Sequence, residues 1–432
     1  MIRIGFDGKR AVSNMTGLGN YSRLVIEEVG KKFQHYANLQ NAPSSDNKNF
    51  SFSQDTSINP ETGKINNPKS TRDFGMYIST PKEDPEDTLP LLVYTEKLTN
   101  NPRLEPIRRL KNIEFRFPPA AGFSGALWRT FGVTNNIVAD KCDIYHGLSN
   151  ELPLNIAGAK VKSVVTIHDI IYRRLPYCYH LPDRIIYDYK YGKSCKNADR
   201  IIAVSECTKR DIMEFYGIPE EKIDVVYQGC SDIFRQEFKR VDFEDIRRRL
   251  DLPDNFIIQV GTIEKRKNLE LTLRALSSLP RINLVVVGAD HHGYKREMIK
   301  LSQELGISDR VKFLNKVDFR DLPLLYSLAD CSLYPSFYEG FGIPILESLE
   351  RNTPVIAAKG SCLEEAGGEG AIYIDPANPR EMAESIRFFM DSTNREEYAA
   401  KGKKHAQRFD NNRMADSILK TYAKVLDTDK LF

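Results

Sequence analysis

Short runs of apolar residues recur along the chain, and each is followed by a loop and then by a segment with helical periodicity. These runs are Ile2–Phe6, Leu91–Tyr94, Val164–Ile167, Ile201–Val204, Phe256–Val260, Leu284–Val287 and Val355–Ala358. Strands that are apolar on both faces and alternate with helices are typical of parallel sheets with helices on both sides. The pattern therefore predicts an α/β protein.

The first strand-and-helix unit shows this order clearly. The strand is followed by a loop that contains Gly17 and Gly19. Asn20 is placed to cap a helix over Tyr21–Phe33. The stretch from about residue 38 to residue 90 is rich in Asn, Ser, Pro and Asp, and it is longer than an ordinary connection. We predict that it is an elaborated or partly disordered loop inserted before the second strand, and we assign it no function.

Two domains are expected, because 432 residues exceed what one hydrophobic core usually serves. Asp224–Gly229 is the last predicted strand of the first half. Arg235–Leu250 has the pattern of a linker followed by an amphipathic helix. We assign residues 1–240 to an N-terminal domain, residues 241–405 to a C-terminal domain, and residues 406–432 to a helix that packs back on the N-terminal domain.

Composition and charge narrow the possible partners and location. The 62 basic and 59 acidic residues leave a net charge of +3, which argues against nucleic acid as a partner. The seven cysteines are scattered without C-x-x-C spacing, which argues against a disulfide framework and a zinc site. The sequence shows neither a signal peptide nor an apolar stretch near the ~20 residues needed to span a bilayer. We expect a cytoplasmic protein, with peripheral contact at the inner face of the membrane left open.

A cationic turn follows the Phe256–Val260 strand and reads Gly-Thr-Ile-Glu-Lys-Arg-Lys-Asn over residues 261–268. Asn268 is a good N-cap for the helical run that follows. Arg266 and Lys267 would then lie where free N–H groups and the helix dipole favour an anion. Beyond the carboxyl end of a parallel strand, two such cations suit a pyrophosphate. The alternative is a solvated basic loop.

Two glutamates in the second half lie eight residues apart. Glu339 belongs to a loop with Gly340 and Gly342, where backbone N–H groups can approach a ligand closely. Pro344 fits the first turn of a helix, so Glu347 is expected in that turn. The two carboxylates could therefore bind two parts of one ligand. The alternative is that Glu347 complements the helix dipole and Glu339 is solvated.

Together these motifs resemble those of the family 4 retaining glycosyltransferases, which have the GT-B architecture of two Rossmann-like domains that face each other across a cleft. The Arg266–Asn268 turn is similar to the phosphate-binding turn of that family, and Glu339 and Glu347 match its E-x7-E motif. The resemblance covers nearly the whole chain outside residues 38–90. Further matching segments are Ala203–Glu206, Tyr334–Ser336, Glu339–Gly342, Pro354–Ala357 and Glu365 to Pro376.

The resemblance implies a role for each matching residue in the second half. Lys267, together with Arg266, would hold the diphosphate of a nucleotide-sugar donor. Glu347 would bind the ribose hydroxyls, and Glu339 would contact hydroxyls of the donor sugar. The chain departs from many relatives at Thr262, where they have arginine, so the diphosphate would depend more heavily on Arg266 and Lys267.

Further residues are assigned to the same pocket. The backbone of Phe341 and Gly342 would line it. His168 ends an apolar strand, and although such a histidine is often structural, the resemblance implies that it approaches the donor sugar near the reacting carbon. His146 ends another strand and is a weaker candidate. The glycine-rich segment around Gly17 and Gly19 resembles the family's first loop, where donor phosphate and acceptor meet, and it is not a G-x-G-x-x-G dinucleotide motif.

The acceptor side carries a weaker pattern. Arg103–Arg129 combines basic and aromatic residues, and could rest on anionic lipid or on a lipid-linked saccharide. The alternative is that its aromatic residues, including Trp128, pack into the first domain. A D-x-D metal motif occurs only as Asp427-Thr-Asp429, close to the end of the sequence, so we expect no metal ion.

These inferences predict a retaining glycosyltransferase that moves a hexosyl unit from a nucleoside-diphosphate sugar to a hydroxyl of a glycan or glycolipid, in the synthesis of surface polysaccharide or glycoconjugate. GDP-mannose is preferred over a UDP-hexose as donor, and no cofactor is expected. Glu339, His168 and Lys267 are assigned to catalysis, with the leaving diphosphate stabilised electrostatically. The alternatives are a nucleotide-sugar epimerase or a phosphorylase on the same fold, or an inactive sugar-nucleotide-binding protein.

Overall fold

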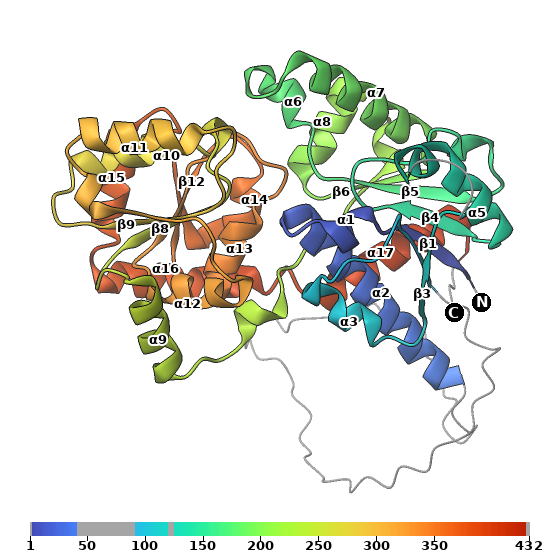
Figure 1. Cartoon of the computed structure of the whole chain (residues 1–432), viewed down its shortest axis with the longest axis horizontal. Coiled ribbons are helices and arrows are strands. Elements are labelled where there is room, and N and C mark those ends of the chain that lie inside the picture. The colour runs from blue at the N-terminus through green and yellow to red at the C-terminus, as the bar shows by residue number, and fades with distance from the viewer. Residues whose placement is uncertain (1, 41–90, 120–124, 429–432) are drawn as a thin grey trace, which may run out of the picture.

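Two α/β domains lie beside each other in the structure, a computed structural model that describes residues 2–40, 91–119 and 125–428 (Figure 1). The loop predicted from about residue 38 to residue 90 lies outside the described residues from residue 41 onward. Its first residues belong to a helix. The prediction of two domains with parallel sheets is confirmed.

The N-terminal domain is built on a parallel sheet whose described strands have the order β3-β2-β1-β4-β5-β6-β7. Alternate residues of one strand enter different cores. In β2, Leu91 and Val93 pack on one side of the sheet, and Leu92 and Tyr94 pack on the other. The strands are β1 Ile4–Asp7, β2 Leu91–Tyr94, β3 Ile113–Arg116, β4 Ile144–Gly147, β5 Lys162–Ile167, β6 Arg200–Ala203 and β7 Ile223–Val225.

Helices cover both faces of this sheet, as the apolar strands require. One face carries α2 together with α17, the last helix among the described residues, and the opposite face carries α5, α7 and α8. The helices of this domain are α1 Lys9–Ser13, α2 Gly17–Gln40, α3 Glu105–Arg108, α4 Gly125–Leu127, α5 Val133–Ala139, α6 Ile171–Arg174, α7 Leu181–Asn197, α8 Glu206–Tyr216 and α17 Asn411–Leu426.

The C-terminal domain repeats the plan, with parallel strands in the order β10-β9-β8-β11-β12-β13. One core packs α10, α11 and α15 on the sheet, and the other packs α9, α12, α13 and α14. The strands are β8 Ile257–Val260, β9 Leu284–Val287, β10 Val311–Leu314, β11 Ser332–Tyr334, β12 Val355–Ala358 and β13 Ala371–Ile374. The helices are α9 Arg240–Leu250, α10 Leu269–Ser277, α11 Tyr294–Glu304, α12 Leu322–Leu328, α13 Ile343–Glu350, α14 Leu363–Gly367, α15 Pro379–Phe388 and α16 Ser392–Ala406.

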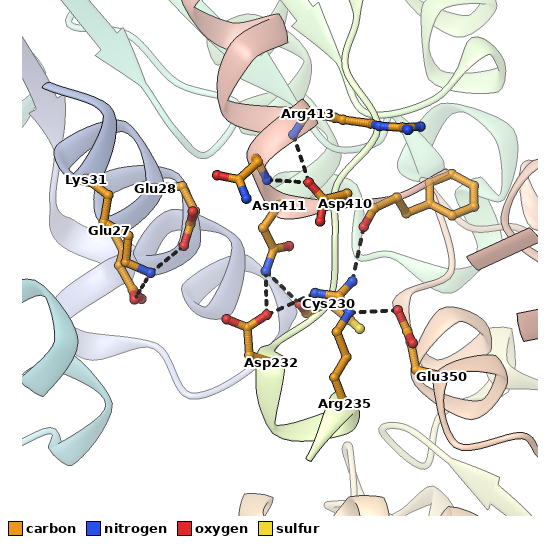
Figure 2. Close-up of polar contacts among 12 residues, drawn as sticks. Glu27, Glu28, Lys31, Cys230, Asp232, Arg235, Glu350, Asp410, Asn411 and Arg413 are labelled. Atoms are coloured by element: carbon orange, nitrogen blue, oxygen red, sulfur yellow. Dashed lines mark hydrogen bonds and ion pairs between the residues drawn. The ribbon is translucent and has the colours of Figure 1, made fainter. Parts of the chain in front are cut away.

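The chain passes between the domains twice, after β7 and again between α16 and α17. Figure 2 shows how the two crossings are joined. The guanidinium of Arg235 donates to Glu350 Oε1 of α13 at 2.9 Å and to the Phe409 carbonyl oxygen at 3.4 Å. Asn411 Nδ2 donates to Asp232 Oδ1 at 3.0 Å. These bonds tie both crossing segments to each other and to the C-terminal domain.

Two predictions about helix ends are wrong. Asn20 does not cap a helix at residue 21, because α2 already begins at Gly17. The Asn20 side chain instead accepts hydrogen bonds from Arg23 and Arg103. The helix predicted from residue 406 begins only at Asn411, as α17, because the Asp410 side chain caps it there and Ala406 is the last residue of α16.

Candidate active site

The cationic turn directly follows β8. Gly261, at its start, has a φ of 147°, which favours glycine. A Cβ atom on Gly288, just after β9, would lie 1.8 Å from the Gly261 carbonyl oxygen, so the backbones leaving two neighbouring strands touch here. Residues Lys265–Lys267 form a single 3-10 turn before α10. The turn thus lies at the carboxyl edge of the sheet.

Asn268 precedes α10 as predicted, but the prediction that its side chain caps the helix is wrong. Its φ is 55°, and no capping bond from its side chain to the helix is found among the described residues. Its Nδ2 atom donates instead to the carbonyl oxygens of Pro335 at 3.1 Å and Pro376 at 2.8 Å. Asn268 therefore holds the cationic turn against the loops that follow β11 and β13.

Lys267 and Glu339, which are 72 residues apart, meet at this edge. Lys267 Nζ donates to Glu339 Oε1 at 2.6 Å and to the Tyr334 hydroxyl at 2.7 Å. The two charged side chains are only 14% and 10% exposed. Burial lowers the pKa of Lys267, and the charge of Glu339 opposes that shift.

Arg266 shares the same carboxylate oxygen. Its Nη1 atom lies 2.7 Å from Glu339 Oε1 and donates to the Tyr338 carbonyl, while Nη2 donates to Glu264. Burial alone would raise the pKa of Glu339, but the charges and hydrogen bonds of Arg266 and Lys267 lower it to about 2. One ionised carboxylate therefore neutralises a large part of two buried positive charges.

Lys267 lines a small hollow at this edge of the sheet. Thr262, the residue at which the chain departs from the family resemblance, lines it. Ser336 also lines the hollow, and its hydroxyl is a buried polar group with no hydrogen-bond partner among the described residues. Other lining residues are Gln259, Gly261, Leu269 and Tyr334. A hollow beside buried cations, with an unpaired hydroxyl, is suited to a polar anionic ligand.

Glu347 lies in the second turn of α13, so its predicted place in the first turn is wrong. It is buried, and the Tyr326 hydroxyl donates to its Oε2 atom at 3.3 Å. Burial raises the pKa of Glu347 to about 7, although this hydrogen bond and the positive charge of Arg103 act in the opposite direction. Glu347 therefore does not complement the helix dipole at the first turn.

The loop between Glu339 and α13 is anchored by an aromatic side chain. Phe341 is 2% exposed, and its ring packs against those of Tyr227 and Phe409 at centroid distances of 5.8 and 5.4 Å. Gly342 has a φ of 105°, which a residue with a side chain rarely adopts. Since the Phe341 side chain belongs to the core, only its backbone is available to a ligand.

His168 directly follows β5 in the N-terminal domain. Its Nε2 atom lies 2.9 Å from the Leu148 carbonyl oxygen, which can only accept, so Nε2 carries the proton and Nδ1 is an acceptor. Burial lowers the pKa of His168 to about 4, so the ring is neutral at pH 7. The edge-to-face ring of Tyr21, at 4.6 Å, and a hydrogen bond from the His168 N–H to Asn150 fix its position.

His146, the weaker histidine candidate, is a buried structural residue. It is fully buried at 0% exposure, and its two ring nitrogens lie 2.7 Å from the Tyr422 hydroxyl and 2.9 Å from the Thr166 hydroxyl. The Tyr21 hydroxyl lies 3.1 Å from the same Thr166 atom. His146 thus links α17 to the sheet.

The two glycines assigned to the first loop belong to the first turn of α2, so the loop prediction is wrong. A Cβ atom on Gly17 would meet no atom within 4 Å. A Cβ atom on Gly19 would lie 2.0 Å from the Asn14 carbonyl oxygen, which explains the glycine by close packing.

The loops of His168 and Glu339 touch across the two domains. A Cβ atom on Gly340 would lie 1.9 Å from the His168 carbonyl oxygen. The Gly340 carbonyl oxygen accepts hydrogen bonds from the Ser205 hydroxyl at 2.6 Å and the Thr208 hydroxyl at 3.2 Å. The cationic turn, Glu339 and His168 therefore lie around one junction between the domains.

Glu365 is a residue of this junction to which the sequence assigned no role. Its carboxylate accepts hydrogen bonds from the backbone N–H groups of Glu206 at 2.8 Å and Cys207 at 2.9 Å, which begin α8 in the other domain. The Tyr227 hydroxyl also donates to it. The Ser205-Glu206 helix start is visible in the sequence, but its partner about 160 residues away is not.

Other expected features can be placed as well. Trp128 is 2% exposed, as the packing alternative for the Arg103–Arg129 segment requires. Asp427 follows α17, while Asp429 lies outside the described residues. Across the described ranges, no three His, Cys, Asp or Glu side chains gather as a metal-binding group. No helix in the part of the chain that the structure describes is both long and apolar enough to cross a bilayer.

Comparison with known families identifies the chain. Residues 90–232 match the family described as Glycosyltransferase Family 4, and residues 242–408 match the glycosyl transferases group 1. The chain belongs to the family 4 glycosyltransferases. The family that the sequence motifs resemble is thereby confirmed, together with the GT-B fold.

Relatives of this glycosyltransferase include two bacterial sugar transferases. The O-antigen chain mannosyltransferase B of Escherichia coli is 29% identical over 272 residues, which cover 62% of this chain and 70% of that protein. The O-antigen chain mannosyltransferase RfbU of Salmonella typhimurium is 26% identical over 223 residues, or 52% of this chain and 59% of that protein. The fold is similar to that of HepE from Anabaena, solved with UDP and glucose, with a TM-score of 0.69 and 18% identity over 98% of this chain and 100% of that chain.

Proposed function

We propose that this glycosyltransferase moves a hexosyl unit from a nucleoside-diphosphate sugar to a hydroxyl of a glycan or glycolipid, in the synthesis of a surface polysaccharide. The observation that carries the proposal is the pairing of Lys267 and Arg266 with Glu339, beside a hollow at the carboxyl edge of the second sheet. The relatives named as O-antigen mannosyltransferases support the acceptor class.

The buried cations suit the diphosphate of the donor. Phosphate oxygens would take over the hydrogen bonds of Lys267 and Arg266 that Glu339 now accepts, and Glu339 would be released towards the sugar hydroxyls. Negative charge develops on the leaving diphosphate as the glycosidic bond breaks. Two fixed cations in a buried site stabilise that charge without a further change in structure.

The remaining roles follow from position and protonation. Glu347, on the neighbouring α13, would accept hydrogen bonds from the ribose hydroxyls. The unprotonated Nδ1 atom of His168 can accept a hydrogen bond from a hydroxyl of the transferred sugar. We infer that the anomeric configuration is retained and that a donor phosphate oxygen takes the proton of the acceptor hydroxyl.

Two observations bear on the identity of the donor. The relatives named as mannosyltransferases support a mannosyl unit, and hence GDP-mannose. HepE, which shares the fold, was solved with UDP and glucose, so a UDP-hexose is the competing donor. We propose GDP-mannose.

Titration calorimetry with GDP-mannose and UDP-glucose tests the site. Lys267→Ala and Glu347→Ala should weaken donor binding by roughly tenfold or more, since each removes a side chain that would hydrogen-bond the donor. Lys265→Ala is the matched control, because Lys265 lies in the same turn but is exposed. If Lys267→Ala and Glu347→Ala both bound donor and transferred sugar like the wild type, the site assignment would be wrong.

Product analysis tests the reaction. NMR spectroscopy of the glycoside should show the anomeric configuration of the donor. Conversion of the donor sugar to an epimer without acceptor would instead indicate an epimerase, and the absorbance of bound pyridoxal phosphate would indicate a phosphorylase.

A further inference from the structure

The outer face of α7 exposes large apolar side chains next to one another. Leu181 is 62% exposed, Ile185 62%, Ile186 50% and Tyr189 62%. These four residues are called the apolar face of α7. The positions 181, 185 and 189 are four residues apart, so their side chains follow one another along one side of the helix. Tyr177, just before the helix, is 69% exposed.

The helix is attached to the domain on its other side. Gly192, Ser194 and Cys195 in its C-terminal half are buried, and Tyr187 and Tyr191 are partly buried against the same core. A contiguous exposed apolar patch of this kind marks an interaction surface more often than single exposed residues do.

Positive charge continues the same side of the helix. Four and seven residues beyond Tyr189 come Lys193 and Lys196, which are both exposed. Lys222 lies at the same end, because its Nζ atom donates to the Lys196 carbonyl oxygen at 2.9 Å. Asp183 is an exposed acidic residue within the apolar half. The surface therefore joins an apolar half to a cationic half.

We propose that the apolar face of α7 and its lysines form the surface by which this protein lies on an anionic lipid bilayer. The apolar side chains would enter the boundary between headgroups and acyl chains, with Tyr189 at the polar border. Lys193 and Lys196 would contact lipid phosphates. An in-plane helix with an apolar side and adjoining lysines is the usual form of such a contact.

A bilayer fits the size of the surface better than a second copy of the chain. The four residues expose on the order of 500 Å², below the ~800 Å² per partner of a stable protein interface. Binding to a bilayer needs no such area, because apolar insertion and attraction to anionic lipid add to each other.

The position of α7 connects this surface to the junction of the domains. His180, the residue before α7, has its ring 6.0 Å from that of His292 in the C-terminal domain. Figure 1 shows α6 and α7 together along one margin of the N-terminal domain. If the proposed function holds, this placement would let the saccharide of a lipid-linked acceptor reach the active site while its lipid stays in the bilayer.

Vesicle flotation of the full-length protein tests the proposal. The protein should float with phosphatidylcholine vesicles that contain about a quarter of phosphatidylglycerol, and should remain below with phosphatidylcholine alone. Combined Ile185→Ser and Tyr189→Ser substitutions, or combined Lys193→Glu and Lys196→Glu, should lower the floating fraction by roughly tenfold. Val241→Ser is the matched control, because Val241 is 61% exposed on α9.

Donor binding by the same variants separates this proposal from the proposed function. The α7 variants should bind GDP-mannose like the wild type, since they change only exposed residues. Absence of donor binding by the wild type would contradict the proposed function alone. A wild-type protein that stays below anionic vesicles, or α7 variants that float with them equally well, would overturn the membrane surface. So would a dimer in sedimentation velocity that Ile185→Ser dissolves, since a second copy would then cover α7.

Discussion

Glu339 holds two cations on a single oxygen atom. Its Oε1 lies 2.6 Å from Lys267 Nζ and 2.7 Å from Arg266 Nη1, and all three side chains are largely buried. A buried ion pair does not by itself stabilise a protein, because removing the charges from water costs about as much as their attraction returns. The arrangement is better understood as a site that keeps two cations ready for a diphosphate.

Replacing Glu339 by glutamine should therefore destabilise the protein without ligand, and should increase the stabilisation that a bound anion provides. The two cations would lose their shared counter-charge, at a cost on the order of 3 kcal/mol. A nucleoside diphosphate would restore that charge, so GDP or UDP should raise the melting temperature of Glu339→Gln by more than that of the wild type. Glu264→Gln, which removes a more exposed partner of Arg266, is the control. Equal melting temperatures and equal shifts would contradict this account.

Glu347 should make stability depend on pH in the opposite sense from a paired carboxylate. Burial raises its pKa from 4.5 to about 7, so the folded protein binds this proton more tightly than the unfolded chain. Its contribution is complete below about pH 4.5 and is lost as the pH rises through about 7. Glu347→Gln should therefore gain stability relative to the wild type between about pH 5 and pH 8, by about 3 kcal/mol at most. Urea unfolding at both pH values would measure this gain, and a difference independent of pH would contradict it.

At the scale of elements, the apolar runs predicted the inner strands better than the edges. All four residues of β3 and of β10 are partly exposed, and their mixed sequences, Ile-Glu-Phe-Arg and Val-Lys-Phe-Leu, contain no continuous apolar run. Two helix caps were predicted wrongly because the capping side chains form hydrogen bonds with other parts of the fold. Asn20 accepts from two arginines, and Asn268 donates to two carbonyl groups.

The candidate site was visible in the sequence as separate clusters. The cationic turn and the two glutamates could be assigned to one ligand only through resemblance to a family. The shared Glu339 oxygen and the Glu365 contact with α8 join residues 72 to 159 positions apart. Such contacts depend on how two sheets and two domains are placed, which a local pattern of residues does not contain.

The loop between β11 and α13 offers a test of the junction. A methyl group at Gly340 would collide with the His168 carbonyl oxygen, which belongs to the backbone and cannot rotate away. Gly340→Ala should push the domains apart and lower kcat by roughly a hundredfold, while calorimetry should still detect donor binding. Gly158→Ala is the control, because its Cβ atom would meet no atom within 4 Å. Wild-type turnover in Gly340→Ala would show that this contact is not required.

At the scale of the whole molecule, the two domains are joined by contacts of different kinds. Two chain crossings are tied together by Arg235 and Asn411 at one end of the interface. At the active site, Gly340 and Glu365 contact the start of α8. Because the crossings are covalent and the contacts at the active site are non-covalent, separation of the two domains should break the Gly340 and Glu365 contacts first.

Glu365→Gln should favour the open arrangement. The substitution removes the negative charge that two backbone N–H groups of α8 now share, at a cost of about 1 to 2 kcal/mol. Small-angle X-ray scattering should then show a larger radius of gyration without donor, and donor should reduce the difference. Glu364→Gln changes the exposed neighbouring residue and should leave the scattering as it is. An unchanged radius in Glu365→Gln would mean that Glu365 does not hold the domains together.

The place of α17 in the fold sets an order for folding during translation. Met414, Ile418 and Tyr422 pack in the same core as Ile4 and Phe6, almost the full length of the chain away. The ribosome makes this helix only after every strand of both sheets. The first sheet must therefore emerge with part of one apolar face bare, while the C-terminal domain is assembled from one continuous stretch of chain. The domain that is synthesised first is thus expected to be the last to complete its core.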